Sequence, residues 1–277
     1  MSMNIRIISE IAKKDISEVL QNKAAWIPML VVPLIMVIII PLALILLPPR
    51  VEMSMDALIS ESDLKFFLEN MPSVFNDSLA GLNDFQTILM IVLGYMFAPM
   101  YLIFPLMVST IIASESFAGE RERKTLESLL FSPASDSELF IGKSLAAFLP
   151  SLIISWGSFI MYVMVINIAS LPVFGYLWFP LPSWYPLVFW VTPALTLLGI
   201  SVTVLISARV QTFMGAYQMS ASLVLIVLLL FAGQMSGIVY LNVLNGLLIG
   251  LFTWFIAGAL LSICIRKFNR YALISGN

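Results

Sequence analysis

The sequence contains no histidine, a single cysteine (Cys264) and few charged residues, which make up 11% of the 277 positions. The absence of His removes the commonest general base and a frequent transition-metal ligand. One Cys can form neither an intrachain disulfide nor a thiolate metal cluster. A net charge of −2 gives the chain no general attraction for nucleic acid. We therefore expect no catalytic, metal or cofactor site in this chain and no nucleic-acid partner.

Hydrophobic residues make up 60% of the sequence, which leaves too little polar surface to cover a globule in water. A helix needs about 20 mostly apolar residues to cross roughly 30 Å of hydrocarbon. Runs of this kind without Asp, Glu, Lys or Arg occupy about 26–47, 87–113, 145–169, 185–207, 213–235 and 239–265. The sequence thus predicts an all-α polytopic membrane protein. It has a six-span domain at 26–265 in the lipid bilayer, an N-terminal segment at 1–25 and a tail at 266–277.

The distribution of Lys and Arg predicts the orientation of the chain. Twelve of the fourteen lie in the N-terminal segment, the loop at about 114–144, the loop after the fourth run and the tail. Arg50 and Lys65 alone lie on the other side. The positive-inside rule places both termini and the 114–144 loop in the cytoplasm. We expect the protein in the cell (plasma) membrane.

Two loops are predicted on the outer side. The first, about 48–86, carries seven acidic and two basic residues, and is either a vestibule that attracts cations or an ordinary solvated loop. The second, about 170–184, is crowded with aromatic residues. We predict an aromatic belt at the membrane interface, with a substrate gate as the alternative, formed by Phe174, Tyr176, Trp178, Phe179, Trp184 and Tyr185.

The N-terminal segment has the periodicity of an amphipathic helix. Apolar residues recur at helical spacing on one face, at Ile5, Ile8, Ala12, Ile16 and Val19. Polar and charged residues occupy the rest of the helix surface. We predict a helix that lies on the cytoplasmic membrane surface, the alternative being an ordinary solvated leader to the first span.

The segment 137–144, SELFIGKS, imitates the phosphate-binding P-loop but lacks its first Gly, which is replaced by Ser137. Ser135 and Glu138 form a capping-box pattern that predicts the start of a membrane helix. A P-loop requires a strand before it and a helix after it to hold the phosphates. We therefore expect no ATPase site in this chain.

The 114–144 loop contains a short amphipathic pattern. Leu126, Leu129 and Leu130 form an apolar ridge among charged residues, and Ser132-Pro133 ends the helical pattern. Such a helix offers a partner protein a ridge that fits a groove, with charges to set its orientation. The alternative is a solvated helix that folds back on the lipid headgroups.

This loop resembles the signature of the type-2 ABC export permeases, most closely the sodium/drug-export-like branch. That signature is a charged cluster, Gly-Thr-Leu-Glu-x-Leu-Leu, Ser/Thr-Pro, and a Gly-Lys that opens the third span. The matching residues are Glu120, Arg121, Glu122, Thr125, Leu126, Glu127, Leu129, Leu130, Ser132, Pro133, Gly142 and Lys143. The sequence departs from the signature at Lys124, where the family usually has Gly.

The resemblance implies the permease subunit of an ATP-driven exporter. Two such subunits, here expected as a homodimer, form the path and bind two separate ATPase subunits, which hold ATP and Mg²⁺. Residues 120–131 are the implied coupling helix. The implied ATPase-coupling residues are Glu120, Arg121, Glu122, Arg123, Thr125, Leu126, Glu127, Leu129, Leu130 and Pro133. The family exports ions, drugs, peptides, lipids and glycans, and the sequence selects none of them.

Two other classes of protein remain open. One is an ATPase-independent channel or secondary transporter, and the other is a membrane assembly subunit that transports nothing. Ion-coupled transporters usually carry buried charged residues in their spans. No apolar run here contains one, so we expect no buried charge in the spanning helices, which disfavours ion-coupled transport.

Overall fold

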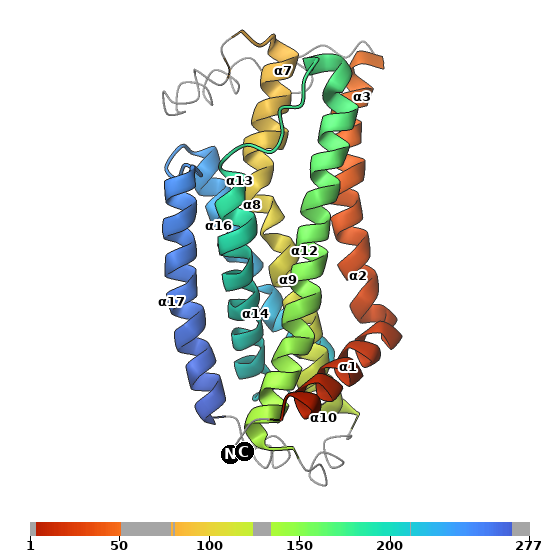
Figure 1. Cartoon of the computed structure of the whole chain (residues 1–277), viewed down its shortest axis with the longest axis vertical. Coiled ribbons are helices and arrows are strands. Elements are labelled where there is room, and N and C mark those ends of the chain that lie inside the picture. The colour runs from red at the N-terminus through yellow and green to blue at the C-terminus, as the bar shows by residue number, and fades with distance from the viewer. Residues whose placement is uncertain (1–3, 51–78, 80, 124–133, 211, 268–277) are drawn as a thin grey trace.

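The computed structural model describes residues 4–50, 79, 81–123, 134–210 and 212–267. Within these ranges the chain contains helices and their connections and no strand. Six of the helical segments are long and apolar enough to cross a membrane. They run side by side along the long axis of the molecule (Figure 1). The predicted all-α, six-span architecture is confirmed.

The spanning segments include several π-helical turns, labelled η. The N-terminal helix is α1 (Ile5–Gln21), and span one contains α2 (Lys23–Leu34), η1 (Ile35–Ile39) and α3 (Ile40–Arg50). Span two contains α7 (Asp84–Leu89), η2 (Met90–Met96), α8 (Phe97–Tyr101), α9 (Ile103–Ser114), η3 (Glu115–Gly119) and α10 (Glu120–Glu122). Span three is α12 (Asp136–Phe174), and span four contains α13 (Trp184–Pro186), η4 (Leu187–Val191) and α14 (Thr192–Ser207). Spans five and six are α15 (Phe213–Ala221) with α16 (Val224–Met235), and α17 (Val243–Lys267).

Spans two and three are longer than their apolar runs, because helical structure continues into the charged 114–144 segment from both sides. Span two reaches Glu122, and α12 begins at Asp136. The start of α12 is fixed by the predicted capping box. The Ser135 side chain accepts from the Glu138 N–H, and the Glu138 carboxylate accepts from the Ser135 N–H.

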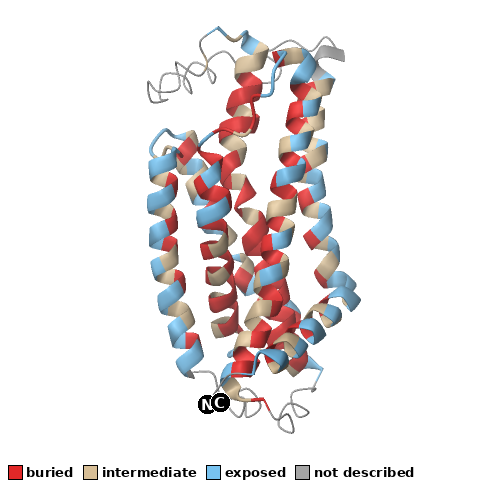
Figure 2. Ribbon diagram, in the orientation of Figure 1, coloured by how far each residue is buried: buried red, intermediate tan, exposed pale blue. Residues whose placement is uncertain are grey.

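The spans differ in how far the protein itself buries them. In the most apolar stretch of each span, 67% of the residues of span two and 61% of those of span four are buried. The corresponding share is 22% in each of spans one, five and six. Spans two and four thus form the centre of the bundle, and the exposed residues lie mainly on the helices around them (Figure 2). Those outer helices present the surface available to lipid or to another subunit.

The predicted aromatic belt at 170–184 is largely wrong. Phe174, Trp178, Phe179 and Trp184 are buried in the bundle, whereas Tyr176 and Tyr185 are 52% and 50% exposed. The segment folds back because Asn167 of α12 holds it: the Asn167 Oδ1 atom accepts from the backbone N–H groups of Trp178 and Phe179. These rings therefore stabilise the interior of the bundle instead of its interface with lipid. Most of the acidic 48–86 loop lies outside the described residues.

The aromatic cluster surrounds an irregular part of span two. Three consecutive carbonyl groups, those of Leu93, Gly94 and Tyr95, accept hydrogen bonds from side chains of other spans. The donors are Tyr162 Oη at 2.8 Å, Trp184 Nε1 at 2.6 Å and Gln234 Nε2 at 2.8 Å. Pro99 has no N–H, so the carbonyl four residues before it, that of Tyr95, lacks its usual helical donor. The side chains satisfy backbone groups that hydrocarbon cannot.

Candidate functional site

The site is built where α1 crosses the first turns of α12. The two helices approach closely because Gly142 of α12 has no side chain. A Cβ atom placed there would lie 2.8 Å from Ile11 Cγ2 and 3.2 Å from the Ile8 carbonyl oxygen. The Gly at this position therefore permits the contact between α1 and α12 that brings the charged side chains of both helices together.

The predicted amphipathic helix is confirmed as α1, and its buried face includes Ile8, Ala12 and Val19. Two details differ from the prediction. Ile5 is 80% exposed, and Asp15 lies on the buried face with only 2% exposed.

Lys143 is at the centre of the site. Its Nζ atom lies 2.7 Å from Glu120 Oε2 and 3.2 Å from Asp15 Oδ2, and it donates to the Ser116 carbonyl oxygen at 2.7 Å. The ammonium group also lies 5.7 Å from the centre of the Phe117 ring. None of the Lys143, Asp15 and Glu120 side chains is more than 2% exposed. One buried Lys thus joins α1, α12 and the end of span two.

A second set of ion pairs surrounds this centre. Lys14 Nζ lies 2.7 Å from Glu120 Oε1 and 3.2 Å from Glu18 Oε1. The Arg123 guanidinium pairs with the buried Glu115 carboxylate and lies 3.3 Å from Glu18 Oε2. These surrounding ion pairs connect α1 to the last residues of span two.

Asn22, between α1 and α2, connects the same network to span one. Its side-chain amide donates to Glu115 Oε2 at 3.0 Å, while its Oδ1 atom accepts from the Ala24 N–H and caps α2. The angle between α1 and span one is therefore set by a contact to span two.

We refer to the four carboxylates and three cations as the ion-pair network: Asp15, Glu18, Glu115, Glu120, Lys14, Arg123 and Lys143. Burial raises the pKa of the Asp15 carboxyl above its usual range, against the opposing charge of Lys143. Burial lowers the pKa of Lys14, but its hydrogen bond to Glu120 and the carboxylates around it leave that pKa above its usual value. Taking such groups out of water is costly, and the cost is recovered only while the partners stay together.

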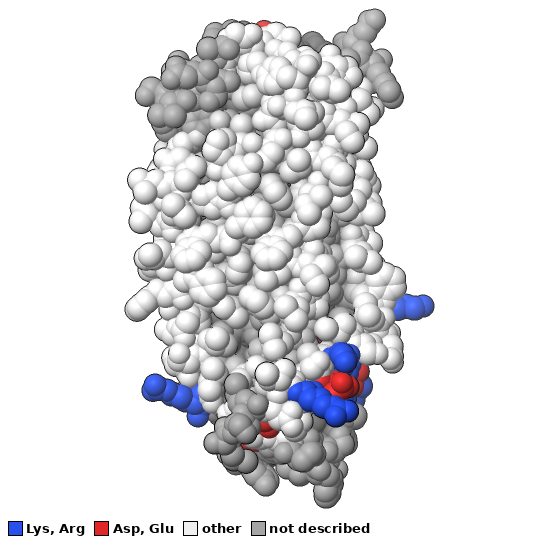
Figure 3. Space-filling model, in the orientation of Figure 1, with Lys and Arg blue, Asp and Glu red and all other residues white. Residues whose placement is uncertain are grey.

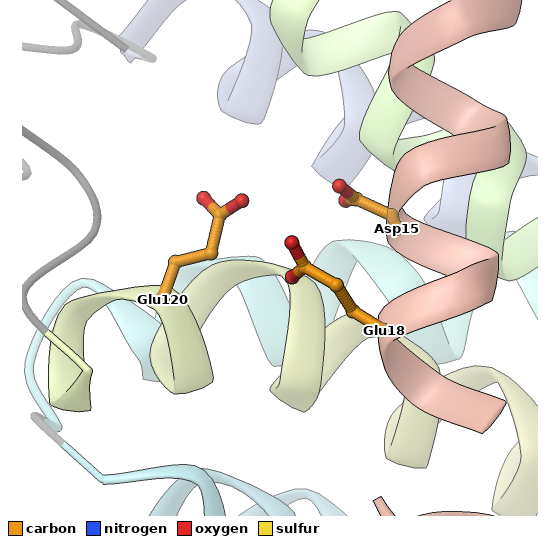
Figure 4. A group of neighbouring side chains, drawn as sticks. All are labelled: Asp15, Glu18 and Glu120. Carbon is orange, nitrogen blue, oxygen red and sulfur yellow. The ribbon is translucent and has the colours of Figure 1, made fainter. Parts of the chain in front are cut away.

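Three of these carboxylates form a group with the spacing of a metal site. Oxygen atoms of Asp15, Glu18 and Glu120 lie within 4.8 Å of one another. Asp15 and Glu18 extend from α1 towards Glu120 on the neighbouring helix (Figure 4). However, the ammonium groups of Lys14 and Lys143 already contact these carboxylates, so the protein itself supplies the compensating charge. We interpret the group as part of the ion-pair network and not as a metal centre.

The predicted coupling residues that the structure describes lie at the end of span two. Glu120 and Arg123 belong to the ion-pair network. Glu122 Oε2 accepts from the Phe213 N–H at the start of α15 at 2.8 Å. The partly buried Arg121 donates to the Ala208 carbonyl oxygen after α14 at 3.5 Å. The other predicted residues lie outside the described residues: Thr125, Leu126, Glu127, Leu129, Leu130 and Pro133.

The expectation that no spanning helix holds a buried charge is wrong. Glu115, Glu120 and Lys143 are buried in the helices of spans two and three, just beyond the apolar runs. The apolar runs do not include these three residues, because each helix continues beyond its apolar run into polar sequence. A signal for Asp15 was available, since it lies three residues after Ala12 and four before Val19, on the apolar stripe of α1.

The fold and the site define a multi-pass helical membrane protein whose buried charges gather at one end of the bundle. On the face drawn in Figure 3, most charged side chains lie near the end occupied by α1. The sequence matches the model of the ABC-2 family transporter proteins over residues 9–257. The chain belongs to this family of membrane transport components, as the signature in the 114–144 loop predicted. Comparison with curated proteins finds no match to this chain.

Proposed function

We propose that the chain is the permease subunit of an ATP-driven ABC exporter. Two copies form the translocation path as a homodimer in the cell membrane, with both termini in the cytoplasm. Two separate ATPase subunits hold ATP and Mg²⁺. Family membership supports the transport role. The single observation that best supports the coupling role is the buried attachment of α10 to α1 and α12 through Lys143.

This attachment provides a route for movement. In the proposed mechanism an ATPase binds the segment after α10 and displaces it during ATP hydrolysis. Because Glu120 and Asp15 share the Lys143 ammonium, α10 cannot move alone without exposing or separating buried charges. α12 is one continuous helix of 39 residues, about 58 Å long, so a displacement at Lys143 reaches the other end of the bundle.

The contacts of α10 on its other side extend this route. Glu122 binds the start of α15, and Arg121 approaches the end of α14. A displaced α10 therefore acts on span five as well as on span three. Movement of spans three and five relative to the rest of the bundle would open a path between two subunits first to one side of the membrane and then to the other.

An ATPase-independent channel or secondary transporter is the second candidate, and the position of the charges disfavours it. Such proteins keep titratable groups along the pathway within the membrane. The network lies at one end of the bundle, and each of its carboxylates is within 4.0 Å of a Lys or Arg nitrogen. Its groups are arranged to hold helices together.

The proposal is tested by Leu129→Asp in the predicted coupling helix, measured by how much ATPase subunit co-purifies with the full-length permease in mild detergent. If Leu129 enters a groove of the ATPase, the substitution buries an unpaired charge, and we expect at least a tenfold loss of bound ATPase. Glu127→Lys should have a smaller effect, because charges at the rim of an interface mainly tune orientation and encounter rate.

The matched control is Ser17→Asp, which adds the same charge to an exposed position on α1. It should leave ATPase binding unchanged, and both variants should insert in the membrane in normal amounts. Wild-type levels of bound ATPase with Leu129→Asp would show that the coupling-helix assignment is wrong.

A further inference from the structure

Helix α1 has three faces, and two of them are occupied by protein. One face packs against α12 with Ile8, Ala12 and Val19. A second face carries Lys14 and Glu18, which pair with Glu120 and Arg123 at the end of span two.

The third face is largely apolar, with the partly exposed Ser9 among its residues, and it is uncovered within the described residues. It carries Ile5, which is 80% exposed, Leu20, which is 63% exposed, and the partly exposed Ile16 between them. An isolated exposed apolar residue needs no explanation, but a row of them on a helix beside a membrane domain points to contact with lipid.

The direction of this face follows from helix geometry. At 3.6 residues per turn, Ile5, Ile16 and Leu20 fall within about 60° of arc, centred about 170° from Lys14 and Glu18. Since Lys14 and Glu18 face the end of span two, the apolar row faces away from it. Exposed apolar residues continue at the start of span one, where Ile27 is 42% and Leu30 is 52% exposed. The row is therefore continuous with the surface that lies in lipid.

Basic residues flank this row. Arg6 and Lys23 are exposed, and neither forms an ion pair with another residue that the structure describes, whereas Lys13 is paired with Glu10 at 3.2 Å. An apolar row with flanking cations matches the headgroup region of a membrane that contains anionic lipid, because the row enters the acyl boundary while the cations meet phosphate groups.

We propose that Ile5, Arg6, Ile16, Leu20 and Lys23, together the α1 lipid face, bind anionic phospholipids of the adjacent leaflet. The same helix carries Asp15, Lys14 and Glu18, so lipid bound to one face stabilises the position of the ion-pair network on the others. This lipid binding goes beyond the transport role, and it can be observed without an ATPase.

The first test measures lipid binding to the purified full-length chain by native mass spectrometry, in titrations with phosphatidylglycerol or phosphatidylcholine. We expect the chain to prefer phosphatidylglycerol. Arg6→Gln combined with Lys23→Gln should weaken phosphatidylglycerol binding about tenfold to thirtyfold and leave phosphatidylcholine binding unchanged. The matched control, Arg209→Gln with Arg266→Gln, removes two exposed charges elsewhere and should preserve the preference. Equal binding of the two lipids, or an equal loss in the control, would overturn the proposal.

The second test locates the face directly. A nitroxide is attached to Leu20→Cys or to Ser17→Cys in the full-length chain reconstituted in phosphatidylglycerol-containing vesicles, with the buried Cys264 changed to Ala in both. The label at position 20 should be accessible to oxygen, which is enriched in lipid. The label at the exposed position 17 should be accessible to a water-soluble nickel complex. The lipid assignment is contradicted if the label at position 20 is accessible to the nickel complex. It is also contradicted if a second subunit shields that label from both reagents. Both tests omit the ATPase, so they can fail independently of the proposed function.

Discussion

The two ends of the helix bundle are held together by different chemistry. At the end occupied by α1, helices meet through buried charges, with Lys143 between Asp15 and Glu120. At the other end they meet through aromatic rings. Trp184 is fully buried, with ring centres of Tyr162 and Phe179 at 5.3 Å and 5.0 Å from its own.

The difference determines what each end can do. A buried charge that loses its partner is strongly destabilising, so the ion-pair network favours concerted movement of α1, α10 and α12. Ring packing leaves no unpaired charge in the interior when helices shift, although the hydrogen bonds to Leu93, Gly94 and Tyr95 still fix the irregular turn of span two. The charged end is suited to receive a displacement, and the aromatic end to hold the spans while they adjust.

Among the substitutions that test this difference between the two ends, Lys143→Met should have the largest effect on stability. The substitution keeps an apolar stem of similar length but leaves Asp15 and Glu120 buried beside each other. We expect a loss of about 3–5 kcal/mol in the free energy of unfolding, measured by thermal or denaturant unfolding of the purified full-length chain.

Two further variants separate charge from packing. Lys13→Met removes an exposed Lys of α1, the helix that packs against α12. It should change the free energy of unfolding by less than about 0.5 kcal/mol. Adding Asp15→Asn and Glu120→Gln to Lys143→Met should recover much of the lost stability, because the triple variant buries no unpaired charge. Failure of this rescue would mean that Lys143 acts by filling space.

The features of the fold that depend on residues close together in the sequence could be predicted from the sequence. Apolar runs located the six spans, and Ser135 with Glu138 located the start of α12. The ion-pair network could not be predicted in the same way. Asp15 and Lys143 are 128 positions apart, and only the crossing of α1 over Gly142 brings them together.

The buried position of the aromatic segment could not be predicted for a similar reason. Its composition is that of an interfacial belt, and nothing local distinguishes Trp178 at the interface from Trp178 in the interior. The decisive contact is made by Asn167, whose side chain also donates to the Phe179 carbonyl oxygen at 2.6 Å. A polar residue inside an apolar run was thus the available sign that a loop folds back onto the helix.

Gly142→Ala should have the second largest effect and act on the charged end through packing alone. The added Cβ atom would meet Ile11 and the Ile8 carbonyl oxygen, so α1 must shift away from α12. We expect a loss of about 1–3 kcal/mol in the same unfolding measurement. The control is Gly157→Ala in the same helix, where a Cβ atom meets nothing within 4 Å. That variant should be neutral or gain up to about 1 kcal/mol, because Ala favours helix over Gly. Similar losses in both variants would show that α1 does not depend on a close approach at Gly142.

The smallest expected effect lies at the aromatic end, with Gln234→Leu. Gln234 is buried in α16, and its side-chain amide donates to the Tyr95 carbonyl oxygen, whose usual helical donor is missing because residue 99 is Pro. Leu keeps the apolar volume and removes this donor, so the cost is one hydrogen bond within the membrane, about 0.6–2 kcal/mol. Gln218→Leu provides the control, since Gln218 is exposed on the same span and its replacement should change stability little. The order of the three losses in the free energy of unfolding tests the difference between the two ends. If Gln234→Leu cost as much as Lys143→Met, the aromatic end would depend on single polar contacts as strongly as the charged end does.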